Sequence, residues 1–237
     1  MTYFLYSGKL QQGRECGVKG EEASHLLARR LKAGERFNFQ DSEGRRFVCE
    51  VIGANKKAFI IKPLGLVIAP PEPKIQIILY QSVVAGQALD YILQKSTELG
   101  AAKIILFNSE RTATELSRDK FKQKFIRWQK ILWEAAKQCD RAKPPTLEFL
   151  ENLDEVMLLT KNFDKVFVCD VSGEKFKVKS QLSKVALVVG PEGGLTFKEL
   201  EKLENLSNSQ LVSLGPLLLR ADTAALAAQA ILRNIFE

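Results

Sequence analysis

The chain has 237 residues, of which 46% are hydrophobic and 27% charged, an ordinary composition for a globular protein that builds its own core. Its formal net charge of +7 permits nucleic-acid binding without establishing it. No hydrophobic run approaches the roughly 18 residues that a membrane span needs, and the N-terminus lacks a signal-peptide pattern, so we expect a cytoplasmic protein. The four scattered cysteines lack the spacing of a zinc site or a disulfide framework, and we expect no metal.

The N-terminal part predicts one helix and several short strands. The helix is expected over 21–31 and contains His25, the only histidine, which we interpret as a structural residue. Alternating apolar and polar runs separated by turns are typical of an antiparallel sheet or a small barrel. The strands are expected over 35–40, 45–52 and 58–61.

A proline-rich stretch follows these strands. Four prolines occur between positions 63 and 73, and proline both removes a backbone donor and restricts its neighbour. We therefore expect a linker or an edge connection there, and the boundary between a domain at 1–70 and a domain at 73–237.

The rest of the chain alternates continuous hydrophobic runs with amphipathic helices, which predicts an α/β domain with a parallel sheet. Buried strands are expected over 75–80, 103–107, 165–169, 185–189 and 210–214. Helices are expected over 89–99, 120–139, 197–206 and from Asp222 or Thr223 to 235.

The most basic part of the chain is 111–143, with ten basic and four acidic residues. Its predicted helix carries an apolar stripe with spacings of four, three and four, which we interpret as core-facing. The stripe consists of Phe121, Phe125, Trp128 and Leu132. The intervening basic residues indicate either a solvated face, which we favour, or a surface for RNA phosphates. They are Lys120, Lys124, Arg127 and Lys130.

Two predicted strands run directly into glycine-containing loops. The first loop, Gly-Pro-Glu-Gly-Gly at 190–194, is neither a P-loop nor a dinucleotide fingerprint. Ligands of α/β sheets bind at the carboxyl ends of strands, where glycine lets backbone approach them, but a strand-to-helix turn can also need glycine. The second loop contains Gly215 and leads through Arg220 to a predicted helix start. We expect Arg220 to be partly buried, either binding an anion or pairing with Asp222 or Glu192.

Several short blocks, taken together and in order, resemble a known enzyme family. The blocks are 94–100, 109–111, 127–128, 134–138 with Arg141, 190–195 and 214–224, with 25–26, Arg30 and Gly34 in the N-terminal part. They are similar to the bacterial small-subunit rRNA uridine-N3 methyltransferases, family E, of the SPOUT superfamily. The resemblance implies a PUA-like small β-barrel that binds RNA, followed by a SPOUT α/β domain with a trefoil knot at about 185–237. It also implies a homodimer that binds S-adenosylmethionine and methylates N3 of a uridine in 16S rRNA of the small ribosomal subunit.

The resemblance assigns residues to roles by position. The cofactor residues would be Val168, Gly190, Pro191, Glu192, Gly193, Gly194, Leu214, Gly215, Leu219 and Thr223. Leu214 and Leu219 would flank the adenine, and the end of the 165–169 strand, through Asp170, would line the same pocket. The RNA-binding residues would be Arg30, Lys124, Arg127, Gln138 and Arg141.

Methylation of uridine N3 requires loss of the imide proton, which calls for a base and for a cation near the resulting anion. The catalytic candidates are Arg220 as the cation, Lys95 or Arg111 assisting it, and Asp222 as the base. Glu98 and Glu192 are alternative bases. The family usually has Thr-Glu-Thr where this chain has Ala221-Asp222-Thr223, so Asp222 is either a shorter-reaching base or a helix cap.

Two other functions remain open from the sequence. One is a different SPOUT RNA methyltransferase, and the other is a catalytically silent RNA-binding or ribosome-assembly protein. A Rossmann-like methyltransferase is disfavoured because 82–87, after the first strand of the domain, offers only Gly86.

Overall fold

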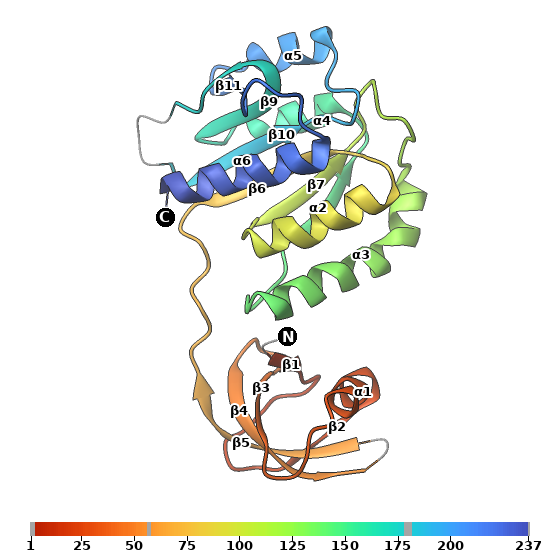
Figure 1. Cartoon of the computed structure of the whole chain (residues 1–237), viewed down its shortest axis with the longest axis vertical. Coiled ribbons are helices and arrows are strands. Elements are labelled where there is room, and N and C mark those ends of the chain that lie inside the picture. The colour runs from red at the N-terminus through yellow and green to blue at the C-terminus, as the bar shows by residue number, and fades with distance from the viewer. Residues whose placement is uncertain (1–2, 56–57, 178–181, 237) are drawn as a thin grey trace. The chain divides into compact units, whose positions relative to one another are not determined.

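The computed structural model describes residues 3–55, 58–177 and 182–236, and it divides the chain into two compact units (Figure 1). The first unit contains the chain up to Pro71 together with Ala136–Lys143. The second contains Glu72–Ala135 and the chain from Pro144 onward. The sequence did not predict that the segment Ala136–Lys143 joins the N-terminal unit.

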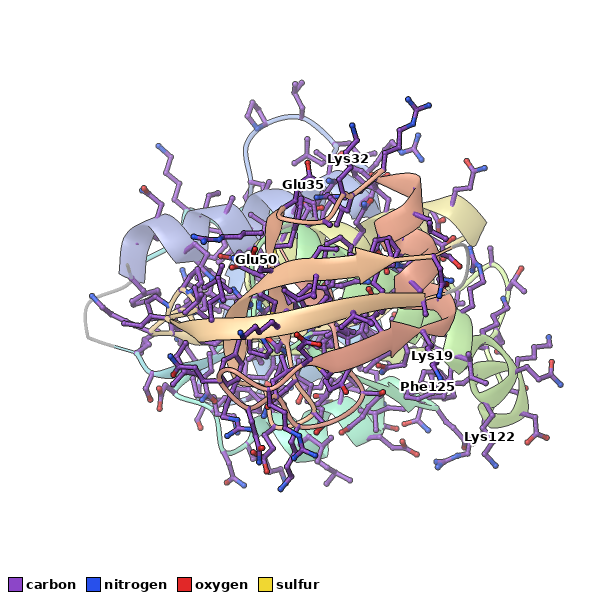
Figure 2. All side chains as sticks on the ribbon, turned by 90° about the horizontal axis from the view of Figure 1, so that it is seen from below. Lys19, Lys32, Glu35, Glu50, Lys122 and Phe125 are labelled. Carbon is purple, nitrogen blue, oxygen red and sulfur yellow. The ribbon has the colours of Figure 1, made fainter. Side chains whose placement is uncertain are left out.

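The first unit is a five-stranded half-barrel with one helix. Its strands are β1 (Tyr3–Leu5), β2 (Cys16–Lys19), β3 (Arg36–Gln40), β4 (Arg46–Ala54) and β5 (Ala58–Val67). They are ordered β1-β3-β4-β5-β2, and all pairs are antiparallel except β1 with β3. Helix α1 (Gly20–Ala28) follows directly from Lys19 (Figure 2). The predicted antiparallel sheet is confirmed, and β1 and β2 extend it beyond the three predicted strands.

The core of this unit follows the two-residue period of its strands. Phe47, Cys49 and Val51 alternate along β4 and are all buried, as is Ile61 on β5. Leu26 of α1 packs into the same cluster. Burial raises the pKa of the Cys49 thiol to about 12, so this cysteine is a neutral core residue. His25 lies on α1 with its Nδ1 3.5 Å from the Glu22 carboxylate.

Strand β5 passes through Pro63, which the sequence predicted to lie in a linker. Pro63 pairs with Cys49 at a point where the register of β4 and β5 shifts, and such a bulge tolerates a residue without a backbone donor. The strand ends only at Val67, so a linker that starts at Pro63 is wrong for 63–67, and the strand is longer than the predicted 58–61.

Buried side chains of the half-barrel hold the segment Ala136–Lys143. The Tyr3 hydroxyl donates to the Arg141 carbonyl at 2.6 Å, and the Gln40 amide donates to the Ala142 carbonyl at 2.7 Å. Arg46, whose side chain is 1% exposed, forms an ion pair of 2.5 Å with Asp140 and stacks on the Tyr3 ring. These contacts fix the turn that follows the long basic helix.

The second unit is an α/β domain. Its strands are β6 (Gln76–Ser82), β7 (Lys103–Phe107), β8 (Thr146–Leu150), β9 (Lys165–Glu174), β10 (Lys184–Val189) and β11 (Ser209–Val212). Its helices are α2 (Gly86–Glu98), α3 (Arg118–Gln138, whose last turn enters the first unit), α4 (Leu153–Thr160), α5 (Phe197–Glu204) and α6 (Ala221–Phe236). The sheet order is β11-β9-β10-β6-β7-β8 and every neighbouring pair is parallel. The predicted parallel sheet is confirmed.

Helices cover both faces of this sheet (Figure 1). Helices α2, α3 and α6 share one core cluster with the sheet, and α4 and α5 share the other. Strands β7 and β8 follow β6 in the chain and lie on one side of it. Strands β9, β10 and β11 come later in the chain and lie on the other side of β6, with β10 directly beside it. Ligand sites in such sheets lie beyond the carboxyl ends of the strands.

The stripe on α3 packs as predicted. Trp128 and Leu132 are buried, and Phe121 and Phe125 pack against the same core. The basic residues between them are exposed, and Lys122 also projects outward from α3 (Figure 2).

Candidate functional site

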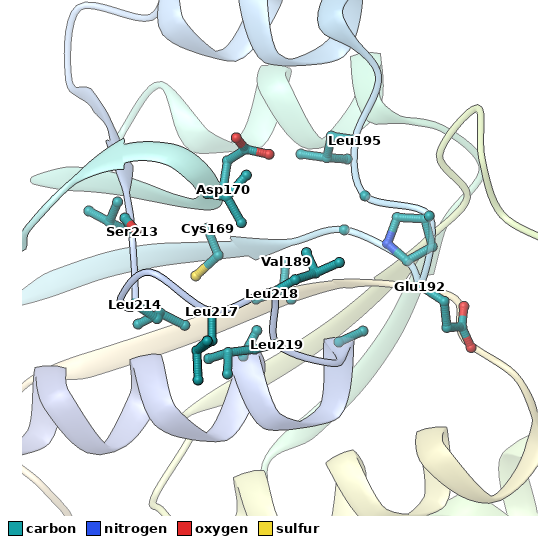
Figure 3. Close-up of a pocket in the computed structure, with 18 of the residues that line it drawn as sticks. Cys169, Asp170, Val189, Glu192, Leu195, Ser213, Leu214, Leu217, Leu218 and Leu219 are labelled. Atoms are coloured by element: carbon teal, nitrogen blue, oxygen red, sulfur yellow. The ribbon is translucent and has the colours of Figure 1, made fainter.

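A cavity of about 280 Å³ lies beyond the carboxyl ends of β10 and β11 and beside the middle of β9 (Figure 3). Three chain segments line it: the middle of β9 at 169–171, the segment 189–195 from the end of β10, and the segment 212–219 from the end of β11. Arg111 and the first turn of α6 complete the lining. This is the edge of the sheet where the glycine loops were expected to bind a ligand.

The loop at 190–194, here called the glycine loop, depends on its glycines for its shape. A Cβ on Gly190 would lie 3.0 Å from the Leu195 nitrogen and 3.1 Å from its Cγ, so the backbone turns too tightly for a side chain. Gly194 has a φ of +70°, which favours glycine. Thr196 then caps α5 through a capping box with Glu199. The loop therefore presents backbone groups rather than side chains to the cavity.

Three contacts hold the glycine loop from outside. The Glu192 carboxylate accepts a hydrogen bond of 2.9 Å from the Ala85 nitrogen at the start of α2. Figure 3 shows the Glu192 side chain on the far side of the cavity from Leu214 and Leu217. Arg111 donates through Nη1 to the Gly193 carbonyl at 2.9 Å. The buried Gln81 donates through its amide to the Gly190 carbonyl at 3.4 Å. A loop held in this way is organised before any ligand binds, which lowers the entropic cost of binding.

The segment 213–220, here called the leucine loop, forms an apolar wall of the cavity. Its lining leucines are Leu214, Leu217, Leu218 and Leu219. Leu217 and Leu218 are 74% and 86% exposed, so this part of the wall is open to solvent. Gly215, at a φ of +126°, turns the chain between β11 and these leucines. Apolar side chains opposite backbone hydrogen-bonding groups suit a flat heterocycle.

Charges at the cavity are few and of both signs. Among the described residues that line it, one side chain is basic, Arg111, and two are acidic, Asp170 and Glu192. Asp170 accepts from the Ser172 nitrogen at 2.9 Å and from its hydroxyl at 2.6 Å. Burial, with a smaller contribution from Asp170, raises the pKa of Cys169 to about 12, so this thiol is neutral. The lining carries a net negative charge, which suits a ligand with a net positive one.

Most of the cofactor residues expected from the sequence line this cavity. They are Gly190, Pro191, Glu192, Gly193, Gly194, Leu214, Gly215 and Leu219. Val168 does not line it, because its side chain is fully buried in the core beneath the α4 and α5 face. Thr223 lies exposed in the first turn of α6. The sequence reasoning missed Leu217 and Leu218, although both stand in the apolar run after Gly215.

The four catalytic candidates are not gathered in the cavity. Arg111 lines it, whereas Arg220, Asp222 and Lys95 do not. The Arg220 side chain is 79% exposed and lies 3.6 Å from the Asp222 carboxylate, so the expected burial is wrong and the expected pairing is confirmed. Lys95 pairs with Glu98 on α2 at 2.8 Å.

Asp222 is not the N-terminal cap of the last helix. Helix α6 begins at Ala221, so Asp222 lies inside the first turn and the expected start at Asp222 or Thr223 is one or two residues late. Its carboxylate accepts from the Thr223 nitrogen at 2.7 Å and lies where the helix dipole favours negative charge.

The expected RNA-binding residues occupy different surroundings. Lys124 lies 5.7 Å above the Trp128 ring, and Arg127 forms two hydrogen bonds with Asp90. Gln138 is exposed at the end of α3, and Arg141 lies in the turn held by the half-barrel. Arg30 is exposed after α1 with a φ of +56°.

No group of three or more His, Cys, Asp or Glu residues within the described part of the chain could hold a metal ion. None of its helices is both long and apolar enough to cross a membrane.

A half-barrel joined to an α/β domain with a loop-lined cavity at its sheet edge is the architecture of an RNA methyltransferase. The family model described as RNA methyltransferase domain matches residues 70–233, and the model described as RNA methyltransferase PUA domain matches residues 18–64. The half-barrel is therefore PUA-like, as predicted.

Similar proteins narrow the family further. The ribosomal RNA small subunit methyltransferase E of Aquifex aeolicus is 30% identical over 97% of this chain and 99% of its own length. The ribosomal RNA small subunit methyltransferase E of Bacillus subtilis is 28% identical over 95% of this chain and 93% of its own length. The chain belongs to the ribosomal RNA small subunit methyltransferase E family.

Two solved structures are similar over nearly their full length. One is a putative methyltransferase from Legionella pneumophila in complex with the cofactor SAM, with a TM-score of 0.87, 25% identity and coverage of 99% of this chain and 98% of that one. The other is a ribosomal RNA small subunit methyltransferase E from Neisseria gonorrhoeae bound to S-adenosyl methionine, with a TM-score of 0.86, 26% identity and coverage of 100% and 98%.

Proposed function

We propose that this chain transfers the methyl group of S-adenosylmethionine to N3 of a uridine in 16S rRNA of the small ribosomal subunit, and that it acts as a homodimer. The observation that carries the proposal is the cavity formed by the glycine loop and the leucine loop at the edge of the parallel sheet. Membership of the methyltransferase E family and the two similar structures that hold this cofactor support the same function.

The cavity fits the chemistry of S-adenosylmethionine. This molecule has a flat adenine, a ribose diol, a sulfonium, and an amino acid end with an ammonium and a carboxylate, for a net charge of +1. Leu214 and Leu219 offer apolar surface for the adenine, and the glycine loop offers backbone donors and acceptors to its edge. Asp170, in the middle of β9, suits the ribose hydroxyls or the ammonium, and one guanidinium faces the cavity for the carboxylate.

The bound cofactor would supply an electrophilic methyl group, and this chain's residues would supply the proton chemistry. Uridine N3 is a poor nucleophile until its imide proton leaves. Asp222 is the proposed acceptor of that proton. Arg220, 3.6 Å away and largely exposed, is the proposed cation beside the imide oxygens, where charge accumulates. Both residues are next to Ala221 in the chain, and Ala221 lines the cavity, so a uridine that approaches the cavity there would meet this pair.

RNA binding is assigned to the N-terminal domain at 1–70, to Lys124, Arg127 and Gln138 on α3, and to Arg141 in the turn that follows it. The methyl-accepting N3 lies on the pairing edge of uridine, so the target base must be unpaired or flipped out of a helix. The proposed contacts are Arg30, Lys124, Arg127, Gln138 and Arg141. The knot at about 185–237, within the domain at 73–237, also remains a prediction.

Methyl transfer to purified small subunits tests the function. Small subunits from a strain lacking the modification would receive label from S-adenosylmethionine, and the labelled nucleoside would be identified by mass. We expect 3-methyluridine, with kcat reduced by about 10²–10³-fold in Arg220→Ala. Arg118→Ala is the matched control, because Arg118 is also exposed and paired with a carboxylate, Glu151, but lies away from the cavity.

Each other result has a defined meaning. Label in a different nucleoside would replace the N3 assignment while keeping the methyltransferase activity. Cofactor binding without transfer to any small-subunit preparation would indicate a silent RNA-binding protein. Equal loss in Arg220→Ala and Arg118→Ala would remove Arg220 from the chemistry.

A further inference from the structure

Arg111 is the basic side chain at the cavity, and it already makes one contact there. It follows β7 in the chain and reaches the glycine loop, where its Nη1 donates to the Gly193 carbonyl. A Cβ built on Gly193 would lie 3.5 Å from the Arg111 Cβ and 3.6 Å from its Cδ, so the side chain lies against the loop along its length. A guanidinium has five N–H donors in a planar fork. One contact with Gly193 therefore leaves donors for a ligand in the cavity.

The other basic candidates do not form the wall of this cavity. Arg220 lies outside the lining and pairs with Asp222, and Lys95 pairs with Glu98 on α2. Within the described part of the chain, Arg111 is the only cation among the residues that form the cavity wall.

Helix α6 offers a second place for an anion, since its first turn also lines the cavity through Ala221 and Ala224. That end of the helix already holds a negative charge of its own. The Asp222 carboxylate accepts from the Thr223 nitrogen at 2.7 Å, which repels a second carboxylate there. Arg111 is thus the better electrostatic partner for an anionic group.

We infer that Arg111 binds the carboxylate at the amino acid end of S-adenosylmethionine and holds that end beside Gly193. The inference rests on the proposed function and assigns Arg111 to cofactor recognition in place of the assisting catalytic role predicted from the sequence. Asp170 and Glu192 complement the two positive charges of the cofactor, and Arg111 complements its single negative one. Arg111 then discriminates cofactors by the presence of the carboxylate.

A double-mutant cycle between protein and ligand tests this role. Calorimetry would measure binding of S-adenosylmethionine and of decarboxylated S-adenosylmethionine, which lacks only the carboxylate, to the full chain and to Arg111→Gln. Arg118→Gln is the matched control, because Arg118 is an exposed arginine of the same unit that does not line the cavity. We expect Arg111→Gln to weaken S-adenosylmethionine by roughly 10- to 100-fold and to change the decarboxylated ligand by less than about threefold. The unmodified chain should prefer S-adenosylmethionine by a similar factor.

The outcomes separate recognition from a purely structural role. If Arg111 only supports the glycine loop, Arg111→Gln weakens both ligands equally, and the inference fails. If it stabilises the uridine anion, Arg111→Gln lowers kcat while the KM for S-adenosylmethionine stays unchanged, and the inference fails again. A raised KM with kcat within about threefold supports it. If the unmodified chain binds neither ligand, the proposed function itself fails. The two outcomes that overturn the role of Arg111 both leave cofactor binding by the unmodified chain intact, so the two failures can be told apart.

Discussion

Gly190→Ala should destabilise the second unit without any ligand present. The added Cβ would lie 3.0 Å from the Leu195 nitrogen, 3.1 Å from its Cγ and 3.2 Å from the Gly194 carbonyl carbon. Two of these atoms belong to the backbone of a tight loop, and Gly190 itself follows β10 in the centre of the sheet, so neither side yields easily. Overpacking of this kind costs about 1–3 kcal/mol. In a protein of this size the melting temperature falls by roughly 2–4 °C for each kcal/mol.

Gly193→Ala is the matched control in the same loop. Its added Cβ would meet nothing closer than the Arg111 Cβ at 3.5 Å, an ordinary contact, so the free energy of unfolding should change by less than about 0.5 kcal/mol. Urea unfolding followed by tryptophan fluorescence suits both variants, because Trp128 and Trp133 are the two tryptophans and both lie on α3 within the second unit. Equal losses in the two variants, or no loss in Gly190→Ala, would refute the close-packing argument.

Three further predictions concern other parts of the chain. Arg46→Met should destabilise the first unit by about 1–3 kcal/mol, because it removes the Arg46 donors to Asp140 and to the buried Gln40 side chain. Hydrogen exchange of β3–β5 would show the loss, and unchanged protection would contradict it. Burial raises the pKa of the Cys49 and Cys169 thiols from 9.0 to about 12, so the folded chain keeps protons that the unfolded chain releases. The free energy of unfolding should therefore fall as pH rises from 9 towards 12, by up to about 1.4 kcal/mol per pH unit for each thiol. Urea unfolding at pH 8 and at pH 10 should show a smaller fall in Cys49→Ala than in the unmodified chain. Glu192→Ala should cost about 1 kcal/mol through loss of its contact with the Ala85 nitrogen, and Glu192→Gln, which keeps an acceptor, should cost less in the same assay.

The sequence predicted the elements whose hydrophobic pattern is long and regular. The runs at β6, β7, β9 and β10 are continuous because both faces of a parallel sheet are covered. It missed β1, with three residues, and β8, whose exposure alternates at the edge of the sheet. Such short strands exist because partners distant in the chain pair with them, as β1 pairs with β3 more than 30 residues later, and no local pattern records that.

The two loops that line the cavity could be predicted because their signal is local. A buried strand that ends in glycines places backbone at the sheet edge whatever the rest of the fold does, and most of the residues predicted there line the cavity. The state of Arg220 could not be predicted in the same way. Its apolar neighbour Leu219 suggested burial, but Leu219 belongs to the cavity wall rather than to the core, and the Arg220 side chain beside it is exposed.

The position of Arg111 depends on contacts between strands that are not neighbours in sequence. It follows β7, and it reaches the loop after β10 only because β6 pairs with both of these strands. Sequence spacing gives no sign of this order, since β7 and β10 are separated by more than 70 residues.

Two arginines among the proposed RNA contacts, Arg127 on α3 and Arg141 in the turn after it, have different surroundings. Arg127 forms two hydrogen bonds with Asp90, which also accepts from the Trp128 indole at 3.2 Å, so Arg127 has a structural task on the helix surface. Arg141 lies instead in the turn that Tyr3, Gln40 and Arg46 fix to the half-barrel. The buried Arg46 stabilises one conformation of that turn. A surface with one fixed conformation can bind a folded RNA in a defined register. Among the proposed RNA contacts, the turn after α3 therefore has stronger support than the middle of the helix.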